Sequence, residues 1–255
     1  MCYDIKTKLE AMLKRARYRN DEARIADLLK ELEPFLEDDI FHASGFAHPT
    51  LLIYTNHDPD VPVSSIWGLV PSWVKGEEQL KVMRNRTLNA RGETIFEKSS
   101  FRHSARQKRC LIYLDGFYEH HEFKGKKYPF LISRTDGEPM AVAGLWSEWI
   151  DRRTGEILHT FSIVTTNANP MMAKIHNNPK LPEPRMPVIL PDDKADDWLI
   201  PCHNDVDQSK LLDMLEPYPQ DLLQAHTVHR LRGKEALGNV PEAAEEFFYE
   251  ELSLE

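Results

Sequence analysis

Cys2 has the most unusual chemical potential in this sequence, because it becomes the N-terminal residue once Met1 is removed. Methionine aminopeptidases generally accept a small second residue, so we expect that removal. The α-amine and the thiol then stand on adjacent carbons, and such a 1,2-aminothiol condenses with an aldehyde to a five-membered thiazolidine. An α-amine, with a pKa of about 7.7–8.0, is also a better nucleophile at neutral pH than lysine, at about 10.4. A Cys at position 2 is commonly accidental, so the hypothesis needs support from other residues.

Two further side chains could move protons. Glu119 follows a buried-strand run and two aromatic residues. A carboxyl group packed against aromatic rings loses hydration and stays protonated to higher pH, which makes it a usable acid near neutral pH. His176 lies at the end of a predicted short helix and before a proline-rich loop, and it can exchange a proton near neutral pH. The structural alternatives are a surface Glu at a strand end and a histidine that only packs.

Four side chains in the middle of the chain suit contact with a nucleic-acid strand. Asn89 can donate and accept hydrogen bonds, and Arg91 offers a planar fork to phosphate. Trp73 follows Pro71 on a predicted loop, where it could stack on bases or simply plug the core. Arg102 adds positive charge. Together they indicate a candidate DNA-binding surface.

The charge of the chain is unevenly distributed. The net charge is −9, which by itself speaks against nucleic acid. Residues 75–134, however, hold 14 Lys and Arg against 7 Asp and Glu, a local net of +7, whereas residues 191–255 hold 5 against 16, a net of −11. This distribution is compatible with a localised phosphate-binding face, and equally with a solvated basic surface.

The cysteines and the apolar pattern exclude several classes of protein. Cys2, Cys110 and Cys202 have no CxxC spacing, which argues against a disulfide framework and against a zinc site. We therefore expect no metal and no cofactor. No apolar run approaches the ~20 residues of a membrane span, and residues 6–20 are charged where a signal peptide would be apolar. A cytoplasmic protein is expected.

The elements that must position these residues are short. Residues 4–33 are expected to be helical, with Asn20 as a cap and Pro34 at the end. The predicted strands are 41–47, 51–55, 63–70, 110–114, 128–132, 140–149, 159–166, 185–191 and 225–231. The predicted short helices are 170–176, 193–199 and 208–215. This order indicates a single α+β domain with a curved, mostly antiparallel sheet or an open β-barrel core flanked by short helices.

Several motifs, taken in order, carry a resemblance. They are Met-Cys at the start, WGLVPSW (67–73), NARGET (89–94) with SFR (100–102), CLIYLDGFYE (110–119), FSIVTT (161–166), and IH (175–176) followed by RMPVILP (185–191). Each motif is weak alone, but six in this order are highly specific. The sequence resembles the SRAP family, the SOS response-associated peptidase domain of abasic-site processing proteins. The resemblance spans residues 1–240, and residues 241–255 remain as an acidic C-terminal tail.

The resemblance implies a role for each matched residue. Members of the family bind single-stranded DNA with an abasic site and cross-link its sugar aldehyde through the N-terminal Cys, so Cys2 corresponds to the cross-linking residue. Asn89 and Arg91 correspond to the residues that hold the lesion and its phosphate. Glu119 and His176 correspond to the Glu and His of the family's motifs. The remaining residues carried over are Thr165 and Thr166, which line the pocket, and Arg185, a phosphate ligand.

The sequence departs from the family pattern in three places. Tyr-Asp follows Cys2 where Gly-Arg is frequent, and His120 follows DGFYE where Trp is usual. Residues 177–184 form a proline-rich insertion where the family often has one residue. These differences alter the first turn, one pocket wall and the surroundings of Arg185.

The expected function is therefore an enzyme-like reaction in DNA repair: a covalent thiazolidine cross-link between Cys2 and an abasic site in single-stranded DNA, made by a monomer that associates with the nucleoid when bound. Glu119 and His176 could also support β-elimination, which is lyase chemistry. One alternative is a thiol autopeptidase in which Cys2 and His176 act as a pair. Another is a module that binds damaged single strands without chemistry.

Overall fold

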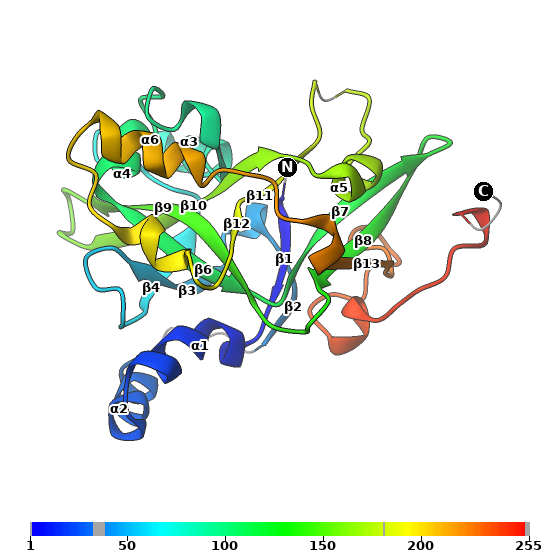
Figure 1. Ribbon diagram of the computed structural model, residues 1–255, viewed down its shortest axis with the longest axis horizontal. Helices are drawn as coiled ribbons and strands as arrows, with labels where there is room; N and C mark the ends of the chain where they lie inside the picture. Colours follow the sequence, from blue (N-terminus) through cyan, green and yellow to red (C-terminus); the bar gives the residue numbers. More distant parts are fainter. Residues whose placement is uncertain (1, 33–38, 181, 253–255) are drawn as a thin grey trace.

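The computed structural model describes residues 2–32, 39–180 and 182–252 (Figure 1). At its centre is a closed barrel, because β10 pairs with β4 and with β9, and β3 and β6 complete the ring. The pairing of β10 with β4 is parallel, and the other four pairings are antiparallel. The barrel strands are β3 (Thr50–Thr55), β4 (Val63–Trp67), β6 (Arg109–Leu114), β9 (Met140–Ile150) and β10 (Ile157–Asn167).

The apolar character of the barrel strands explains why they lie inside. All six residues of β6 are buried, as a continuous hydrophobic run predicts for a strand covered on both faces. Trp67 closes the interior by stacking on Phe161, with ring centroids 6.2 Å apart. Three short strands extend this sheet: β5 (Asn89–Arg91), β11 (Arg185–Pro187) and β12 (Ile189–Leu190).

A second sheet holds the N-terminus against the barrel. Its strand order is β13-β8-β7-β1-β2, and every pairing in it is antiparallel. Asp4 of β1 lies opposite Tyr118 of β7, so the chain start is drawn beside the DGFYE motif. The strands are β1 (Asp4–Thr7), β2 (Ile40–Ser44), β7 (Gly116–Phe123), β8 (Lys126–Arg134) and β13 (Leu223–Thr227).

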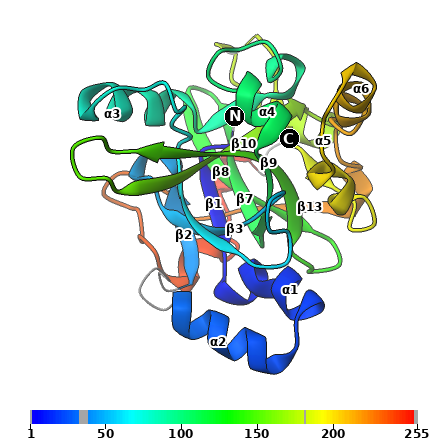
Figure 2. The ribbon, with the colours of Figure 1, turned by 90° about the vertical axis from the view of Figure 1, so that its left-hand side faces the viewer.

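The helices lie around the two sheets. Helices α1 and α2 project from one side of the molecule, whereas α3, α4, α5 and α6 lie on the side where the N-terminus emerges (Figures 1 and 2). The α-helices are α1 (Leu9–Arg19), α2 (Glu22–Leu32), α3 (Glu77–Arg86), α4 (Arg102–Gln107), α5 (Pro170–Ile175) and α6 (Asp205–Asp213). The 3-10 helices are η2 (Gly45–Ala47), η3 (Gly92–Thr94), η4 (Ala195–Leu199), η5 (Gln220–Leu222), η6 (Pro241–Ala244) and η7 (Glu250–Leu252).

The predicted fold class is confirmed, and the barrel is closed rather than open. The helix predicted for residues 4–33 is wrong at its start, because Asp4–Thr7 is a strand that pairs on both edges. Asn20 ends α1 instead of capping a new helix, and the Asp21 carboxylate accepts the Arg24 N–H at 2.8 Å as the cap of α2. The predicted end at Pro34 lies outside the described residues.

Other predicted elements differ at their edges. The strand predicted to reach residue 70 ends at Trp67, where Gly68 adopts a φ of 120°, and the helix predicted for 193–199 is a 3-10 helix. Helix α3 and the length of β7 have no counterpart in the prediction.

The described part of the acidic tail packs against the second sheet. Phe247 N–H donates to the Thr227 carbonyl oxygen at 2.8 Å, and the Tyr249 hydroxyl donates to that of Val228 at 2.9 Å. Within the described residues, no helix has the length and apolar character to cross a membrane.

Candidate active site at the N-terminal strand

Cys2 is buried where the two sheets meet. Its side chain is 1% exposed, and its carbonyl oxygen accepts a hydrogen bond of 2.7 Å from Nδ2 of Asn89. Asn89 is held by β5, which runs parallel to β10 with Asn89 opposite Ile163. Within the described residues, Oδ1 of Asn89 is buried without a hydrogen-bond partner. Met1 lies outside the described residues.

Glu119 and His176 lie together beside Cys2. The distance from Oε2 of Glu119 to Nδ1 of His176 is 3.6 Å, and both side chains are buried. Glu119 also accepts the His120 N–H at 3.0 Å. Burial raises the pKa of the Cys2 thiol, and the Glu119 carboxylate raises it further, so these two groups are close enough to interact. Cys2, Asn89, Glu119 and His176, predicted from distant parts of the chain, therefore converge.

Helix α5 positions His176. Asn169 caps this helix by accepting the Met172 N–H at 2.8 Å, Pro170 occupies its first turn, and the His176 N–H closes its end on the Met172 carbonyl oxygen at 2.7 Å. Burial lowers the pKa of His176, although the Glu119 carboxylate opposes that shift. The imidazole is therefore held toward its neutral form.

Arg185 supports His176 from β11. Its backbone N–H donates to Nδ1 of His176 at 3.1 Å. Its guanidinium is 2% exposed and binds both carboxylate oxygens of Glu93 at 2.8 Å, and the same group donates to the Thr165 carbonyl oxygen at 2.7 Å. The guanidinium of Arg185 is thus engaged by Glu93 and Thr165 inside the protein.

The other candidate DNA contacts lie at the surface. Arg91 is exposed two residues after Asn89, and Arg102 is exposed at the start of α4. Trp73 lies in a turn and is 46% exposed, with its Nε1–H donating to the Ser99 carbonyl oxygen at 3.3 Å. Thr165 and Thr166 are buried, and their hydroxyl groups bind the carbonyl oxygens of Ala90 and Leu215.

A groove of about 290 Å³ opens beside Glu119 and His176. Its lining residues come from the N-terminal segment, η2, the hairpin β7–β8, the segment after α5 and the segment after β13: Tyr3, Asp4, Phe46, Tyr118, Glu119, His120, Glu122, Lys127, His176, Asn178 and Arg232.

Several groove residues were not predicted from the sequence. The buried carboxylate of Asp4 binds Arg232 through both oxygens, at 3.0 and 2.8 Å, and His42 at 3.0 Å. These partners come from distant parts of the chain, so a local sequence pattern could not predict the ion pairs of Asp4. The one available signal is the Tyr-Asp that replaces the frequent Gly-Arg after Cys2.

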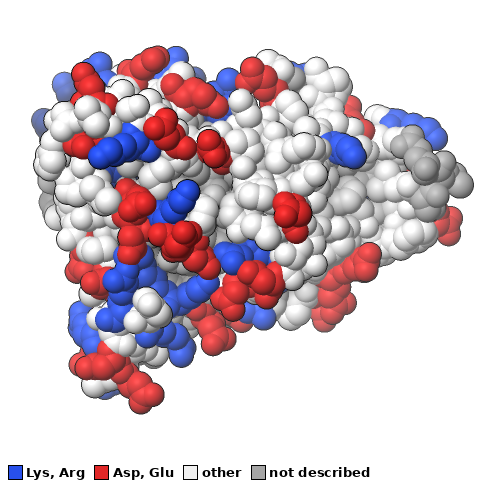
Figure 3. Space-filling view, in the orientation of Figure 1, with Lys and Arg blue, Asp and Glu red and all other residues white. Residues whose placement is uncertain are grey.

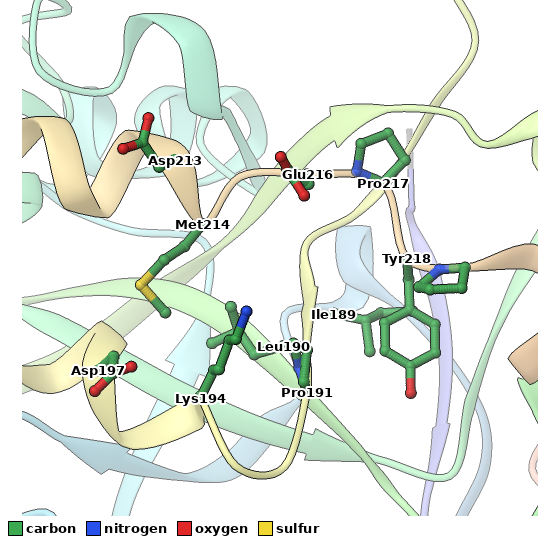
Figure 4. A pocket seen from close by; sticks show the side chains of 11 residues that line it. Ile189, Leu190, Pro191, Lys194, Asp197, Asp213, Met214, Glu216, Pro217 and Tyr218 are labelled. Atoms are coloured by element: carbon green, nitrogen blue, oxygen red, sulfur yellow. The ribbon is translucent and has the colours of Figure 1, made fainter.

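A second pocket, of about 400 Å³, lies between the segments 189–197 and 213–219 (Figure 4). The carboxylates of Asp197, Asp213 and Glu216 stand around it, with Lys194 as its basic residue. Such a rim repels phosphate, and none of the lining residues is a predicted site residue. Among the described residues, no cluster of His, Cys, Asp or Glu could hold a metal ion.

Most of the chain matches one known protein family. A sequence profile described as "SOS response associated peptidase (SRAP)" matches residues 16–234. The chain belongs to the SRAP family. The predicted resemblance is thereby confirmed over most of the chain.

Named relatives support the same assignment. The chain is 35% identical over 204 residues to the abasic site processing protein YoqW of Bacillus subtilis, covering 78% of this chain and 85% of the relative. It is 33% identical over 153 residues to the abasic site processing protein HMCES of Gallus gallus, covering 52% of this chain and 43% of that protein.

Solved structures agree on the fold. A crystal structure of a protein from Bacteroides thetaiotaomicron has a TM-score of 0.83 and 30% identity, with 97% of this chain and 100% of that chain covered. A structure from Bordetella bronchiseptica has a TM-score of 0.67 at 24% identity, covering 89% and 99%, and shows the fold alone.

Proposed function

We propose that this protein processes abasic sites in single-stranded DNA and forms a covalent thiazolidine cross-link through the mature N-terminal Cys2. The observation that carries the proposal is the convergence of Cys2, Asn89, Glu119 and His176 at one buried point. The names of the relatives, abasic site processing proteins, support the lesion as the substrate.

The reaction begins at the α-amine of Cys2 after Met1 has been removed. The amine attacks the aldehyde carbon of the ring-opened sugar and forms a carbinolamine. Loss of water from the carbinolamine gives an imine, and the Cys2 sulfur then adds to the imine carbon. The thiol hydrogen ends on the ring nitrogen, so one molecule of water leaves overall.

Asn89 is placed to orient the amine. Its Nδ2 already holds the Cys2 carbonyl oxygen, and its buried Oδ1 is free within the described residues to accept a hydrogen bond. A buried acceptor without a partner is costly, so it is satisfied most simply by the amine or by a hydroxyl group of the sugar. This hydrogen bond would fix the direction of attack.

Glu119 is the proposed acid for the loss of water, after its carboxylate has taken the proton that the attacking amine gives up, and His176 assists at the sugar hydroxyl that ring opening releases. Their burial excludes water and strengthens every interaction between charged groups. The backbone N–H of Arg185 holds Nδ1 of His176, and its guanidinium is paired with Glu93, so we propose that Arg185 positions this segment instead of contacting a phosphate. Arg91, Arg102 and Trp73 are proposed to contact the strand.

A denaturing gel tests the cross-link. Mature protein is incubated with single-stranded DNA that carries one abasic site, and a shifted band that survives denaturation is expected. Cys2→Ala should give none, whereas Cys202→Ala, which removes a buried thiol elsewhere, should cross-link normally. If wild type gives no shifted band, or if Cys2→Ala gives the same band, the proposal fails.

The autopeptidase alternative requires Cys2 as a thiolate paired with a base. Burial and the Glu119 carboxylate raise the pKa of this thiol, and His176 is already engaged with Arg185. This environment favours the amine as the first nucleophile. The mass of Cys2→Ala made without methionine aminopeptidase separates the two, because only an autopeptidase needs the thiol to lose Met1.

The same gel addresses the remaining alternatives. A lyase would release a cut DNA strand, so a shortened strand that disappears in Glu119→Gln would add β-elimination to the activity. A module that only binds would show salt-sensitive binding in solution but no band after denaturation.

A further inference from the structure

The turn after β2 presents an exposed phenyl ring. Phe46 lies in η2, and 49% of it is exposed although its neighbour Gly45 is buried. The Gly45 N–H donates to the Tyr3 carbonyl oxygen at 2.7 Å, which ties this turn to the residue after Cys2. An aromatic ring left half in water next to a reactive residue needs an explanation.

The turn is firmly held beneath the ring. A side chain on Gly45 would lie 3.0 Å from the ring of Trp67, so the backbone packs directly on that fully buried indole. His48 follows in the left-handed conformation, with φ 55°, and its Nδ1 lies 2.8 Å from the Trp67 carbonyl oxygen. Phe46 is therefore presented by a rigid support.

The ring of Phe46 is backed by Tyr3. The two ring centroids are 5.0 Å apart at an interplanar angle of 35°, and both residues line the groove that contains Glu119 and His176. Tyr3 directly follows Cys2, so the aromatic pair begins one residue from the reactive group. The groove that holds this aromatic pair is therefore the opening next to Cys2, which is itself buried.

The charge of the groove favours stacking over phosphate binding. Carboxylates of Asp4, Glu119 and Glu122 face cations of Lys127 and Arg232, and Arg232 is already paired with Asp4. With this near balance of charge, the groove offers little attraction to an anion. Its distinctive feature is the half-exposed aromatic face.

We propose that Phe46, backed by Tyr3, stacks on the base of the nucleotide next to the abasic site. This inference rests on the proposed function. The lesion itself has no base, so its neighbour loses a stacking partner in the strand, and the phenyl ring replaces that partner. Stacking of this kind tolerates any base, because every base has a π-face. Phe46 is thus a positioning residue that sets the lesion over Cys2.

The test measures affinity for an unreactive analogue. The probe is single-stranded DNA with one tetrahydrofuran residue, which lacks the aldehyde, and binding is followed by fluorescence anisotropy. Phe46→Ala should raise the Kd at least about 5-fold. Phe46→Trp should bind like wild type, and Phe248→Ala, which removes a ring that is 68% exposed outside the groove, should have no effect.

Two further probes identify the stacked base. In each, the base on one side of the tetrahydrofuran residue, 5′ or 3′, is also removed. The effect of Phe46→Ala should vanish on one of these probes and persist on the other. A loss that persists on both, or an unchanged Kd for Phe46→Ala on the first probe, overturns the inference.

Cross-linking separates this inference from the proposed function. At saturating protein and with a true abasic site, Phe46→Ala should reach the wild-type final yield. Failure of wild type to cross-link overturns the proposed function and this inference together. Cross-linking by wild type, with no dependence on Phe46 in the binding assay, overturns the inference alone.

Discussion

Three of the four residues proposed to do chemistry are buried, and Asn89 is half-buried. Cys2, Glu119 and His176 lie where water is excluded, and each is held by a backbone group or a neighbour. Burial has a measurable consequence for titration, because it penalises whichever form of a group carries charge. His176 shows this at the level of a single residue.

His176 should make the protein less stable in acid. Its pKa is lowered in the folded protein, chiefly by burial, below the ordinary value of about 6.5. The unfolded chain therefore binds the proton first, so the stability that the neutral imidazole provides is fully present above about pH 6.5 and is lost as pH falls toward the folded pKa.

The measurement is urea unfolding at pH 7 and at pH 5. His176→Gln should lose less unfolding free energy between these pH values than wild type does. His103→Gln, at an exposed position in α4, should lose as much as wild type. An identical loss in His176→Gln and wild type would contradict the proposed environment of His176.

Among the site residues, the sequence predicted the types better than the partners. Cys2, Asn89, Glu119 and His176 follow from motifs, and the fold brings them together, while their roles stay predictions. The enclosure of Arg185 by Glu93 was not predictable, because the ion pair joins residues 92 positions apart and both have ordinary surface-type side chains. From the sequence alone, an arginine close to the proposed catalytic histidine suggests a phosphate ligand, and only its neighbours in the fold show that its guanidinium is already paired.

At the level of elements, strand β1 positions the candidate site, because it follows Cys2 directly and pairs with β7, which carries Glu119. Four residues, DIKT, precede a strongly helical run, so helical periodicity dominates any local prediction. The strand forms because β2 and β7 supply hydrogen bonds on both edges. Local patterns cannot predict a pairing between strands more than a hundred residues apart in the sequence. The interior strands of the barrel, in contrast, can be predicted from their apolar runs.

Gly116 tests the importance of this pairing. It begins β7, and a side chain there would lie 2.7 Å from the Ile132 carbonyl oxygen and 2.8 Å from Leu131. Because backbone must move to admit a methyl group, Gly116→Ala should lower the unfolding free energy by about 1–3 kcal/mol. It should also slow cross-linking, since β7 carries Glu119.

Denaturant unfolding and the initial cross-linking rate check this prediction. Lys126→Ala, at an exposed position of the same hairpin, should leave both unchanged. Gly116→Ala with wild-type stability and rate would mean that the register of β7 does not govern the site.

Across the whole molecule, formal charge overstates the positive surface. Arg109 belongs to the basic stretch but is fully buried among the carbonyl oxygens of Ala105, Arg106, Trp198 and Ile200. The acidic segment 191–255 is also partly neutralised, because Asp196 forms ion pairs with Arg15 and Arg19 of α1. On the face in Figure 3, blue and red accordingly lie side by side over α1. The count of charges along the sequence could not reveal this pairing.

Arg91 should therefore carry a measurable share of the remaining attraction to DNA. Plots of log Kd against log salt have a slope that reports the number of phosphate contacts. Arg91→Ala should reduce that slope by about 0.7 for single-stranded DNA. Arg153→Ala, at a 74% exposed position of the β9–β10 turn, should leave it unchanged. Equal slopes for Arg91→Ala and wild type would remove Arg91 from the proposed interface.

The intact mass of the purified protein and of its DNA adduct tests the central claim most directly. The account predicts a protein without Met1, and an adduct whose mass equals protein plus abasic DNA minus one water. In Cys2→Ala that adduct should be absent. A protein that retains Met1 and still forms the adduct would contradict the account, because the reactive aminothiol would not exist.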